Sequence, residues 1–412
     1  MSLKSKIKDI ILSNAAVSNN RTIGVEEESL VFQSDGKRIP VKSQTTTDAN
    51  TLIQNLNQKT KNNGFYTLEP GGQVEWSSPP LPDLNQLYQA MKKHQSMLES
   101  ELSASQLKII YFGLDPAHDP KEIKLLDDKK YQIMDEKMGN IGGTGRWMMR
   151  NTASIQVSID FTDLRDLEEM VFVADCLHPV AAYLFANSPY KNGQGIKKVN
   201  IRNVIWNHTD KVRCRNLSDH DIISSNRLLD KYIDFVLNVP AIFQIGESNT
   251  IRSSNKKIAD LISGSAWEEA LFQEQIFYFF RQIFTNVRIK NVVEIRGSDR
   301  PPRGFEIAPV AFWSGLLMEK KTRKAIYDIC SKWTVDDRDK FDSCSMGFDE
   351  KKIGPEGKTY LSWVKQIGEL SLKGLINRKL GEEKYFESFY DIIIKNGPYS
   401  IQEQKKSPTY SP

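Results

Sequence analysis

The sequence predicts an α+β fold that forms a single unit over residues 1–412. Short stretches of alternating apolar and polar residues, typical of β-strands, recur between residues 21 and 297. Longer stretches with helical periodicity lie between them and dominate the last quarter of the chain. No internal repeat and no abrupt change of composition divides the chain. The hydrophobic content of 39% and the aromatic content of 10% suffice for a sizeable core and exclude wholesale disorder.

The charge pattern excludes several classes of protein. The chain has 56 basic and 52 acidic residues, and this near balance, spread along the chain, argues against a dedicated nucleic-acid binder. No stretch approaches the ~18 uninterrupted apolar residues of a membrane span. The four cysteines form neither a CxxC pair nor a cluster with histidine. We expect a cytoplasmic protein with no nucleic-acid or membrane partner, and the sequence leaves its oligomeric state open.

The N-terminal third predicts two helices and a hairpin. A short amphipathic helix is expected over residues 3–13 and a strand over residues 21–32. Residues 65–76 read as a hairpin folded at Pro70-Gly71, because proline presets φ at the first turn position and glycine supplies φ > 0 at the second. Asp83 is the expected N-cap of a helix that runs to about residue 102.

The rest of the chain predicts two further strands among helices. A glycine-rich loop at residues 139–145 precedes residues 152–161, the longest clean strand pattern in the sequence. Helical periodicity covers residues 163–186 and resumes at Leu228. A capping-box pattern at residues 265–268 opens an aromatic helix that is expected to end near Thr285. A strand over residues 287–297 is followed by helices to residue 396 and by a frayed tail over residues 397–412.

Polar residues share one face of several predicted strands. In residues 152–161 the two-residue period separates Ile155, Val157 and Ile159 from Gln156 and its polar neighbours. Taken alone, this pattern is typical of a sheet with one solvated side. The same arrangement recurs elsewhere with carboxylates on the polar face. The polar-face residues are Glu26, Glu28, Glu69, Gln73, Glu75, Arg150, Thr152, Ser154, Gln156, Ser158, Glu294 and Arg296.

If these strands are neighbours, five glutamates meet in one concave site. Two such charges at 4 Å repel by roughly 4 kcal/mol at an effective dielectric near 20, so the cluster requires cations. Oxygen ligands favour Mg²⁺ or Mn²⁺, which commonly act with nucleotide phosphates. Arg296 would then stabilise charge on a transferring phosphoryl group. Each glutamate alone is typical of a solvated surface residue, and the parity of Glu27 sends it to the opposite face.

Seven segments keep the same order as in one known family, whose match extends from about residue 21 to residue 380. They are IGVEEE (23–28), LEPGGQVEWSSPPL (68–81), YQIM (131–134), MMRNTASIQVSIDF (148–161), LFANSPY (184–190), RNVIWNHTDKVR (202–213) and VVEIRGSDRPP (292–302). In these segments the chain resembles the plant and proteobacterial type of glutamate-cysteine ligase. The stretch TASIQV also resembles the actinobacterial glutamate-cysteine ligases, which make the same product.

This resemblance implies a glutamine-synthetase-like fold, in which a curved antiparallel sheet packed with helices forms a funnel for ATP, Mg²⁺ and L-glutamate. It implies that ATP phosphorylates the γ-carboxylate of L-glutamate and that the amine of L-cysteine attacks the acyl phosphate. The implied metal ligands are Glu26, Glu28, Glu69, Glu75, Gln156 and Glu294. The implied catalytic residue is Arg296, and the implied substrate-binding residues are Arg202, as a clamp on the α-carboxylate, with Trp206 and Arg213 nearby.

The chain departs from the plant pattern mainly around the amino-acid pockets. Glu27 replaces a histidine, Lys130 replaces an arginine, and Arg150 is displaced by one position, since Asn151 stands before the central strand. Ile242 lies where the plant pattern has an aromatic residue. Lys130, Arg150 and Ile242 therefore complete the candidate substrate-binding set. Two alternatives remain: a γ-glutamyl ligase for another amine, and a non-catalytic nucleotide- or glutamate-binding relative.

Two further patterns are interpreted without a functional role. The stretch Gly354–Thr359 imitates a phosphate-binding loop, but its first glycine is two residues too close and no strand precedes it, which indicates an ordinary turn. The aromatic run Phe277–Phe280 indicates a buried helix that needs no ligand.

Overall fold

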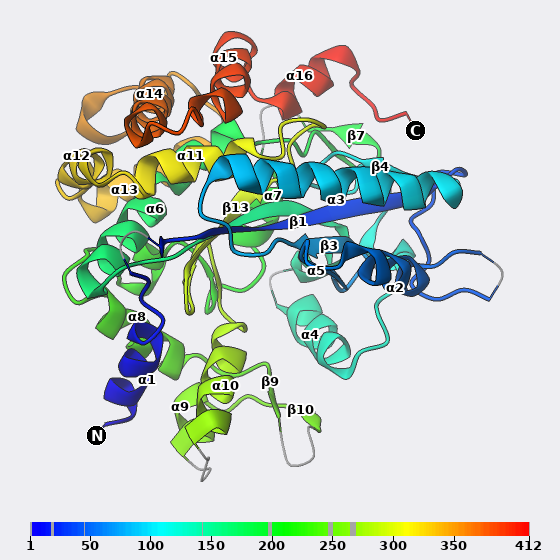
Figure 1. Cartoon of the computed structure of the whole chain (residues 1–412), viewed down its shortest axis with the longest axis horizontal. Helices are drawn as coiled ribbons and strands as arrows, with labels where there is room; N and C mark the ends of the chain where they lie inside the picture. The colour runs from blue at the N-terminus through cyan, green and yellow to red at the C-terminus, as the bar shows by residue number, and fades with distance from the viewer. Residues whose placement is uncertain are drawn as a thin grey trace.

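An antiparallel sheet of seven strands lies at the centre of this computed structural model, which describes residues 2–17, 20–44, 46–141, 143–196, 200–245, 250–263 and 269–411 (Figure 1). The strands are β1 (Ile23–Gln33), β2 (Phe65–Leu68), β3 (Val74–Ser77), β4 (Leu107–Ile110), β5 (Ser154–Ile159), β6 (Tyr190–Lys191), β7 (Gln194–Gly195), β8 (Cys214–Arg215), β9 (Phe243–Ile245), β10 (Ile251–Ser253), β11 (Phe284–Thr285), β12 (Val287–Ile289) and β13 (Val293–Asp299). The main sheet has the order β12-β13-β5-β1-β3-β2, and β4 pairs with the far end of β1.

Helices cover both faces of the sheet. Figure 1 shows α3, α11 and α14 on one side of β1 and α4, α9 and α10 on the other. The helices are α1 (Leu3–Leu12), α2 (Ala49–Thr60), α3 (Leu84–Ala104), α4 (Lys129–Asn140), α5 (Gly145–Asn151), α6 (Leu164–Leu184), α7 (Ile201–Asn207), α8 (Leu228–Asn238), α9 (Ile258–Ser263), α10 (Glu269–Phe280), α11 (Ala308–Leu317), α12 (Lys320–Cys330), α13 (Val335–Gly347), α14 (Tyr360–Arg378), α15 (Glu387–Asn396) and α16 (Tyr399–Lys406).

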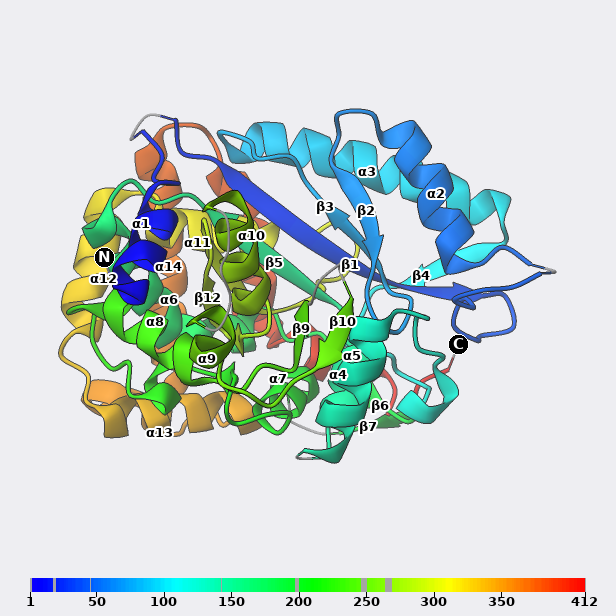
Figure 2. The same ribbon diagram turned by 90° about the horizontal axis from the view of Figure 1, so that it is seen from below.

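The predicted fold class is confirmed as a mixed fold with an antiparallel sheet. Residues 152–161 were predicted to form the longest strand, but the strand there, β5, covers only Ser154–Ile159. Strand β1, with 11 residues, is longer. Figure 2 shows β1 running diagonally across the molecule between β3 and β5. Val25 pairs with Val157, and Ile23 pairs with Ile159, so the apolar face of both strands enters one buried cluster.

Residues 287–297 form a hairpin and not the single strand that the alternation predicts. Strands β12 and β13 pair antiparallel, with Arg288 opposite Glu294 and a tight connection at residues 290–292. The predicted faces of this strand are confirmed. Val293 and Ile295 are buried in the core, and Glu294 and Arg296 alternate with them on the other side of the strand. Hairpin formation adds a second polar pair, Arg288 and Lys290, to the same side.

The predicted turn at Pro70-Gly71 joins β2 to β3, but its positive φ lies one residue later. The amide of Gly72 donates to the carbonyl of Glu69 at 2.8 Å, and Gly72 has φ of 77°. Gly71 is needed for another reason, since a Cβ there would lie 2.4 Å from the carbonyl oxygen of Arg150. The turn therefore holds Glu69 close to the C-terminal end of α5, which leads into β5.

Helix predictions hold best where a cap is visible. Asp83 accepts a hydrogen bond from the amide of Gln86 at 2.8 Å and caps α3 as expected. The expected frayed tail is wrong, because residues 399–406 form α16 and the amide of Tyr410 donates to Gly193. The capping box predicted at residues 265–268 lies outside the described residues, and the aromatic helix α10 ends at Phe280. The Gly354–Thr359 stretch is confirmed as a turn.

Within the described ranges, no helix has both the length and the apolar character that crossing a membrane requires.

Candidate active site

The polar faces of β1, β3 and β5 lie side by side, so the assumption that these strands are neighbours is confirmed. Glu26 is directly opposite Gln156 of β5, and Glu28 is directly opposite Glu75 of β3. The core residues of these strands fix this orientation, because a shift of one residue would turn every carboxylate into the apolar core. Three of the five predicted glutamates are therefore brought together by strand pairing alone.

These side chains line a cavity of about 790 Å³ that has two walls of opposite charge. The acidic wall comes from β1, the turn after β2, and β3, and consists of Glu26, Glu28, Glu69 and Glu75. The basic wall comes from the end of α10, from β12 and from β13, and consists of Arg281, Arg288, Lys290 and Arg296. Such a site favours a ligand or a set of ligands that carries both cations and anions.

Burial and the charges of neighbouring glutamates raise the pKa values of two residues in the acidic wall. Burial raises the pKa of Glu69 to about 7, and the charges of Glu28 and Glu26 add to the effect. Burial also raises the pKa of Glu75 well above its ordinary value, with further contributions from Glu69, Glu26 and Glu28. A hydrogen bond of 2.9 Å from the Thr67 hydroxyl only partly offsets this for Glu75. The wall therefore favours a bound cation.

A chain of hydrogen bonds joins the two walls through Gln156. The Gln156 amide donates to Glu28 Oε1 at 2.9 Å, and Gln156 Oε1 accepts a hydrogen bond from Arg296 Nη1. Arg296 also donates to Glu294 Oε2 at 3.2 Å. Burial raises the pKa of Glu28, although Arg202 and Arg296 oppose this shift. Gln156 therefore orients a carboxylate of one wall and a guanidinium of the other.

Glu294 occupies a different environment from the other predicted metal ligands. It is fully buried and forms ion pairs with Arg288, Lys290 and Arg296. Burial would raise its pKa, but these three cations outweigh burial and hold the pKa well below the ordinary value. Its carboxylate does not line the described cavity. In this structure Glu294 supports the basic wall, and its predicted role as a metal ligand stays a prediction.

The remaining predicted ligands suit a divalent ion by chemistry, although they are not drawn together around one point. In the part of the chain that the structure describes, no three acidic, histidine or cysteine side chains are close enough to hold one metal ion. Four carboxylates and an amide oxygen nevertheless share one cavity, and this all-oxygen set fits Mg²⁺ or Mn²⁺. Their role as ligands stays a prediction.

Arg202 and Trp206 of α7 present free donors beside Arg296. Arg202 is buried, donates to the Arg296 carbonyl at 3.2 Å, and lies 3.8 Å from Asp299. Among the described residues, neither Arg202 Nε nor Trp206 Nε1 has a hydrogen-bond partner. Both arginines lie 5.8 Å from the centre of the Trp206 ring. Trp206 lines the main cavity, and Arg202 lines a small hollow next to it.

Lys130 lies at the opposite rim of the cavity, at the start of α4. Its ammonium is 4.2 Å from the centre of the Tyr131 ring and 3.8 Å from a carboxylate oxygen of Asp128. The side chain is about one-third exposed and lines the cavity. Its predicted contact with a substrate stays a prediction.

Three predicted substrate-binding residues do not line the cavity. Arg150 lies in α5, not in the strand, and its guanidinium is bound to Asp135 of α4 at 2.6 Å and to two carbonyls. Arg213 is bound to Asp210 at 2.7 Å and to the carbonyls of residues 240 and 282. Ile242 is buried in a small apolar cluster. All three pack within the protein around the cavity, and their predicted contact with a substrate stays a prediction.

The parity of Glu27 is confirmed, but its surroundings are not those of a surface residue. Glu27 is fully buried on the opposite side of β1 and is bound to Arg300 at 2.7 Å. His94, stacked on Trp76 at 4.4 Å, lies 3.5 Å from the same carboxylate oxygen. Arg300 also donates to the carbonyl of Glu28 at 2.6 Å, so this buried pair holds the backbone that presents the acidic wall.

Sequence reasoning missed three of the four residues of the basic wall, Arg281, Arg288 and Lys290, and several aromatic residues of the cavity. Arg288 and Lys290 alternate with Val287 and Ile289, which is the same two-residue signal that identified the glutamates. The aromatic run at 277–280 was interpreted as core, yet Tyr278 lines the cavity. Phe243, the neighbour of Ile242, also lines it, and no signal in the sequence distinguishes the two.

Comparison with known proteins identifies the family of the chain. Residues 22–402 match the model of glutamate-cysteine ligase family 2. The chain belongs to this family. The family assignment confirms the predicted resemblance and the predicted class of enzyme, a ligase. It also spans every element that contributes to the two walls, from β1 to β13.

Individual relatives of family 2 are distant in sequence. The chain is 26% identical over 359 residues to the chloroplastic glutamate–cysteine ligase of Medicago truncatula, covering 82% of this chain and 68% of the relative. It is 28% identical over 360 residues to the chloroplastic enzyme A of Oryza sativa subsp. indica, covering 82% and 71%. The crystal structure of the Francisella tularensis glutamate–cysteine ligase in complex with AMP shares the fold, with a TM-score of 0.60 at 12% identity and coverage of 94% and 85%.

Proposed function

We propose that the chain is an ATP- and Mg²⁺-dependent ligase that joins the γ-carboxylate of L-glutamate to the amine of L-cysteine. The observation that carries this proposal is the single cavity with an acidic wall facing a basic wall, in a member of glutamate-cysteine ligase family 2. A volume of about 790 Å³ lies within the range of about 300 to 1,000 Å³ that is typical of small-molecule sites. We further propose that the sheet forms the funnel of a glutamine-synthetase-like fold.

The acidic wall is proposed to hold the divalent ions that accompany ATP. Glu26, Glu28, Glu69 and Glu75 offer carboxylate oxygens, and Gln156 adds an amide oxygen. Mg²⁺ bound there would neutralise charge on the β- and γ-phosphates and align them for transfer. The raised pKa of Glu69, to about 7, supports this assignment, because carboxylates that repel one another in a buried wall are stabilised by a cation.

The basic wall is proposed to bind the phosphate oxygens. Arg296 lies where it contacts both Gln156 and Glu294, so its guanidinium is held in place before substrate arrives. Such a preorganised donor stabilises charge that develops during phosphoryl transfer. Arg288 and Lys290 share the Glu294 carboxylate with Arg296, which leaves this wall with excess positive charge toward the cavity.

The proposed reaction has two steps. A γ-carboxylate oxygen of L-glutamate attacks the γ-phosphorus of ATP, the bond to ADP breaks, and γ-glutamyl phosphate forms. The amine of L-cysteine, after loss of a proton, then attacks the acyl carbon, and phosphate leaves with the electron pair of the broken C–O bond. Positioning of two substrates in one closed cavity supplies much of the rate gain in such transfers.

Arg202 and Trp206 are proposed to bind the α-carboxylate of L-glutamate. Each has a buried donor without a partner in the described chain, and an unsatisfied buried donor costs about 1 to 3 kcal/mol, so a carboxylate that accepts from both recovers that energy. Arginine suits this task because its planar fork binds a carboxylate through two parallel hydrogen bonds. Lys130, across the cavity, is proposed to contact the acceptor amino acid.

Phosphate release tests this proposal directly. Purified protein with ATP, Mg²⁺ and L-glutamate should release phosphate at the full rate only when L-cysteine is added. Equal release without L-cysteine would argue for hydrolysis. A panel of other amines in the same assay identifies the acceptor, because a γ-glutamyl ligase for another amine would prefer that amine over L-cysteine.

A further inference from the structure

A second cavity, of about 1220 Å³, lies at the end of the sheet where β1 begins. It is lined by Arg21 just before β1, by the N-terminal turns of α6 and α12, and by the C-terminal end of α14. It shares no lining residue with the catalytic cavity. Figure 1 shows α12 at the edge of the molecule, away from α4 and α10.

The lining of this cavity is strongly charged and unbalanced. Seven basic and four acidic side chains face it, a formal excess of three positive charges. The basic residues are Arg21, Arg165, Lys320, Lys321, Arg323, Lys324 and Arg378, and the acidic residues are Asp163, Asp166, Glu169 and Asp328.

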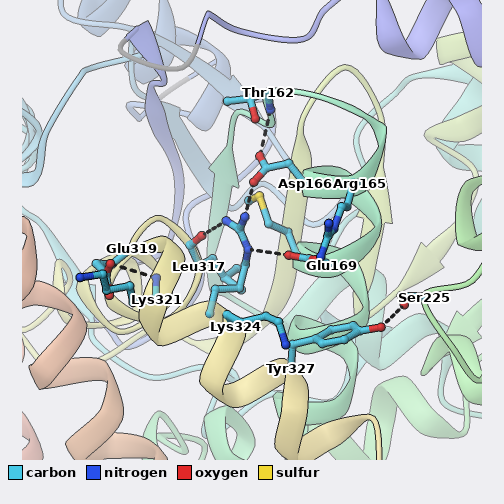
Figure 3. A network of polar contacts seen from close by, with 12 residues as sticks. Thr162, Arg165, Asp166, Glu169, Ser225, Leu317, Glu319, Lys321, Lys324 and Tyr327 are labelled. Carbon is cyan, nitrogen blue, oxygen red and sulfur yellow. Dashed lines mark hydrogen bonds and ion pairs between the residues drawn. The ribbon is translucent and has the colours of Figure 1, made fainter.

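Two carboxylates of α6 are shared by three arginines. Asp166 and Glu169 turn toward α12 and form ion pairs with Arg323 (Figure 3). Asp166 also lies 3.7 Å from Arg21, and Glu169 also accepts from Arg165 at 2.9 Å. The carboxylates therefore cannot neutralise all of the guanidinium groups around them.

Arg323 is the most buried of these arginines, with 3% of its side chain exposed. Its Nε atom is buried and has no hydrogen-bond partner among the described residues, since the Glu169 oxygen is 3.6 Å away. Burial lowers the pKa of Arg21, and the charges of Arg323 and Arg378 lower it further, against the charge of Asp166. Three guanidinium groups thus repel one another around a cavity large enough for a ligand.

Lys320 and Lys321 add mobile charge at the rim. Both are exposed, and within the described ranges no carboxylate lies within the 4.0 Å of an ion pair from either ammonium. The helix N-terminus itself is not available for binding, because Glu319 accepts hydrogen bonds from the amides of Lys321 and Thr322. Any anion here would be bound by side chains.

We propose that this cavity is a second ligand site that binds a small polyanion carrying two or more phosphate or carboxylate groups. Anionic groups match the unpartnered Nε of Arg323 and the ammonium groups of Lys320 and Lys321 at the rim. Arg378 is already held by Glu382 at 2.6 Å and adds charge without a free fork. Arg21 donates to the carbonyl of Asp160, directly after β5, at 3.0 Å. Arg21 therefore joins the start of β1 to the end of β5, the two strands that carry Glu26 and Gln156.

The test is calorimetric titration of the full chain with pyrophosphate and, separately, with citrate, in EDTA and without nucleotide. We expect at least one of the two to bind. Comparing them shows whether the cavity prefers phosphate or carboxylate groups. The Lys320→Gln/Lys321→Gln variant should weaken one binding event at least tenfold and keep phosphate release with both amino acids.

The control variant loses the same two positive charges at positions outside this cavity. Lys395→Gln/Lys405→Gln, on exposed positions of α15 and α16, should bind both probes like the wild type. Failure of both probes to bind, or unchanged binding in the Lys320/Lys321 variant with a wild-type circular dichroism spectrum, overturns the proposal. Neither result bears on the catalytic cavity, whose activity is measured separately.

Discussion

Arg288 of β12 and Glu294 of β13 face each other in the antiparallel register, and their side chains form a buried ion pair inside the wall of the catalytic cavity. Lys290 and Arg296 bind the same carboxylate. The buried carboxylate of Glu294 thus forms ion pairs with three cationic side chains. The net charge that faces the cavity stays positive, and the ion pairs stabilise the sheet beneath it. This relationship separates Glu294 from the four carboxylates of the opposite wall.

Glu294→Gln is expected to lower stability as well as activity. Removing one partner of a buried ion pair typically costs about 3 to 5 kcal/mol, because the remaining charges stay buried without compensation. Urea denaturation should show this loss, and phosphate release should fall because Arg296 is no longer held in place. The Arg288→Met/Glu294→Met variant should recover part of the stability but not the activity. Wild-type stability in Glu294→Gln would contradict the role given to this carboxylate.

The acidic wall predicts a pH dependence that Mg²⁺ should remove. Glu69 has an ordinary pKa of 4.5 and a folded-state pKa of about 7, mainly through burial. Between these values the folded chain keeps a proton that the unfolded chain has released, so the free energy of unfolding falls as pH rises from about 4.5 to about 7. Thermal denaturation in EDTA across this range measures the effect.

Two controls make this pH prediction specific. Mg²⁺ stabilises the ionised carboxylates and should flatten the curve near pH 7. Glu69→Gln should lessen the decline without Mg²⁺, while Glu75, whose pKa is also raised, still contributes to it. Equal slopes of the wild type and Glu69→Gln over this range in EDTA would argue against a raised pKa of Glu69.

The fold was predictable wherever a strong local signal coincided with tertiary packing. Alternation identified β1, β3 and β5, and Asp83 identified the start of α3. Alternation alone did not show that residues 290–292 reverse the chain, because the apolar period continues through the turn. The tail was misjudged since its polar composition hides the contacts of Tyr410 and α16 with residues near position 193.

The site was predictable on the strands and not on the helices. The two-residue period gives the face of a strand residue directly, which placed Glu26, Glu28 and Glu75 correctly. Arg150 was misplaced because the strand pattern was extended backwards into α5. Tyr278 and Phe243 depend on how α10 and β9 pack against α4, and sequence spacing carries no such information.

Phe243 and not Ile242 is expected to influence the choice of acceptor. Phe243 lines the cavity, whereas Ile242 is 1% exposed and lies in the apolar cluster behind it. Phe243→Ala should change the ratio of kcat/KM values across a panel of acceptor amines. Ile242→Ala should instead cost about 2 to 5 kcal/mol of stability and keep the order of preference. A changed order of preference in Ile242→Ala alone would reverse this assignment.

The buried pair Glu27–Arg300 is expected to stabilise β1 against acid. Burial opposes ionisation of Glu27, but Arg300 and His94 outweigh it and hold its pKa at about 2. A lowered pKa contributes stability above the ordinary value of 4.5 that is lost as pH falls toward about 2. Glu27→Gln should therefore be less stable than the wild type at pH 7 by about 3 to 5 kcal/mol, and this difference should narrow at pH 3.

The same pair links stability to the site, because Arg300 donates to the Glu28 carbonyl at 2.6 Å and to the Ser29 hydroxyl at 2.9 Å. Arg300→Met should release this stretch of β1 and raise the Mg²⁺ concentration needed for half-maximal phosphate release. Arg303→Met, in the same loop but with an exposed side chain, is the matched control and should behave like the wild type. An unchanged Mg²⁺ requirement in a folded Arg300→Met variant would show that the pair stabilises the sheet without positioning Glu28.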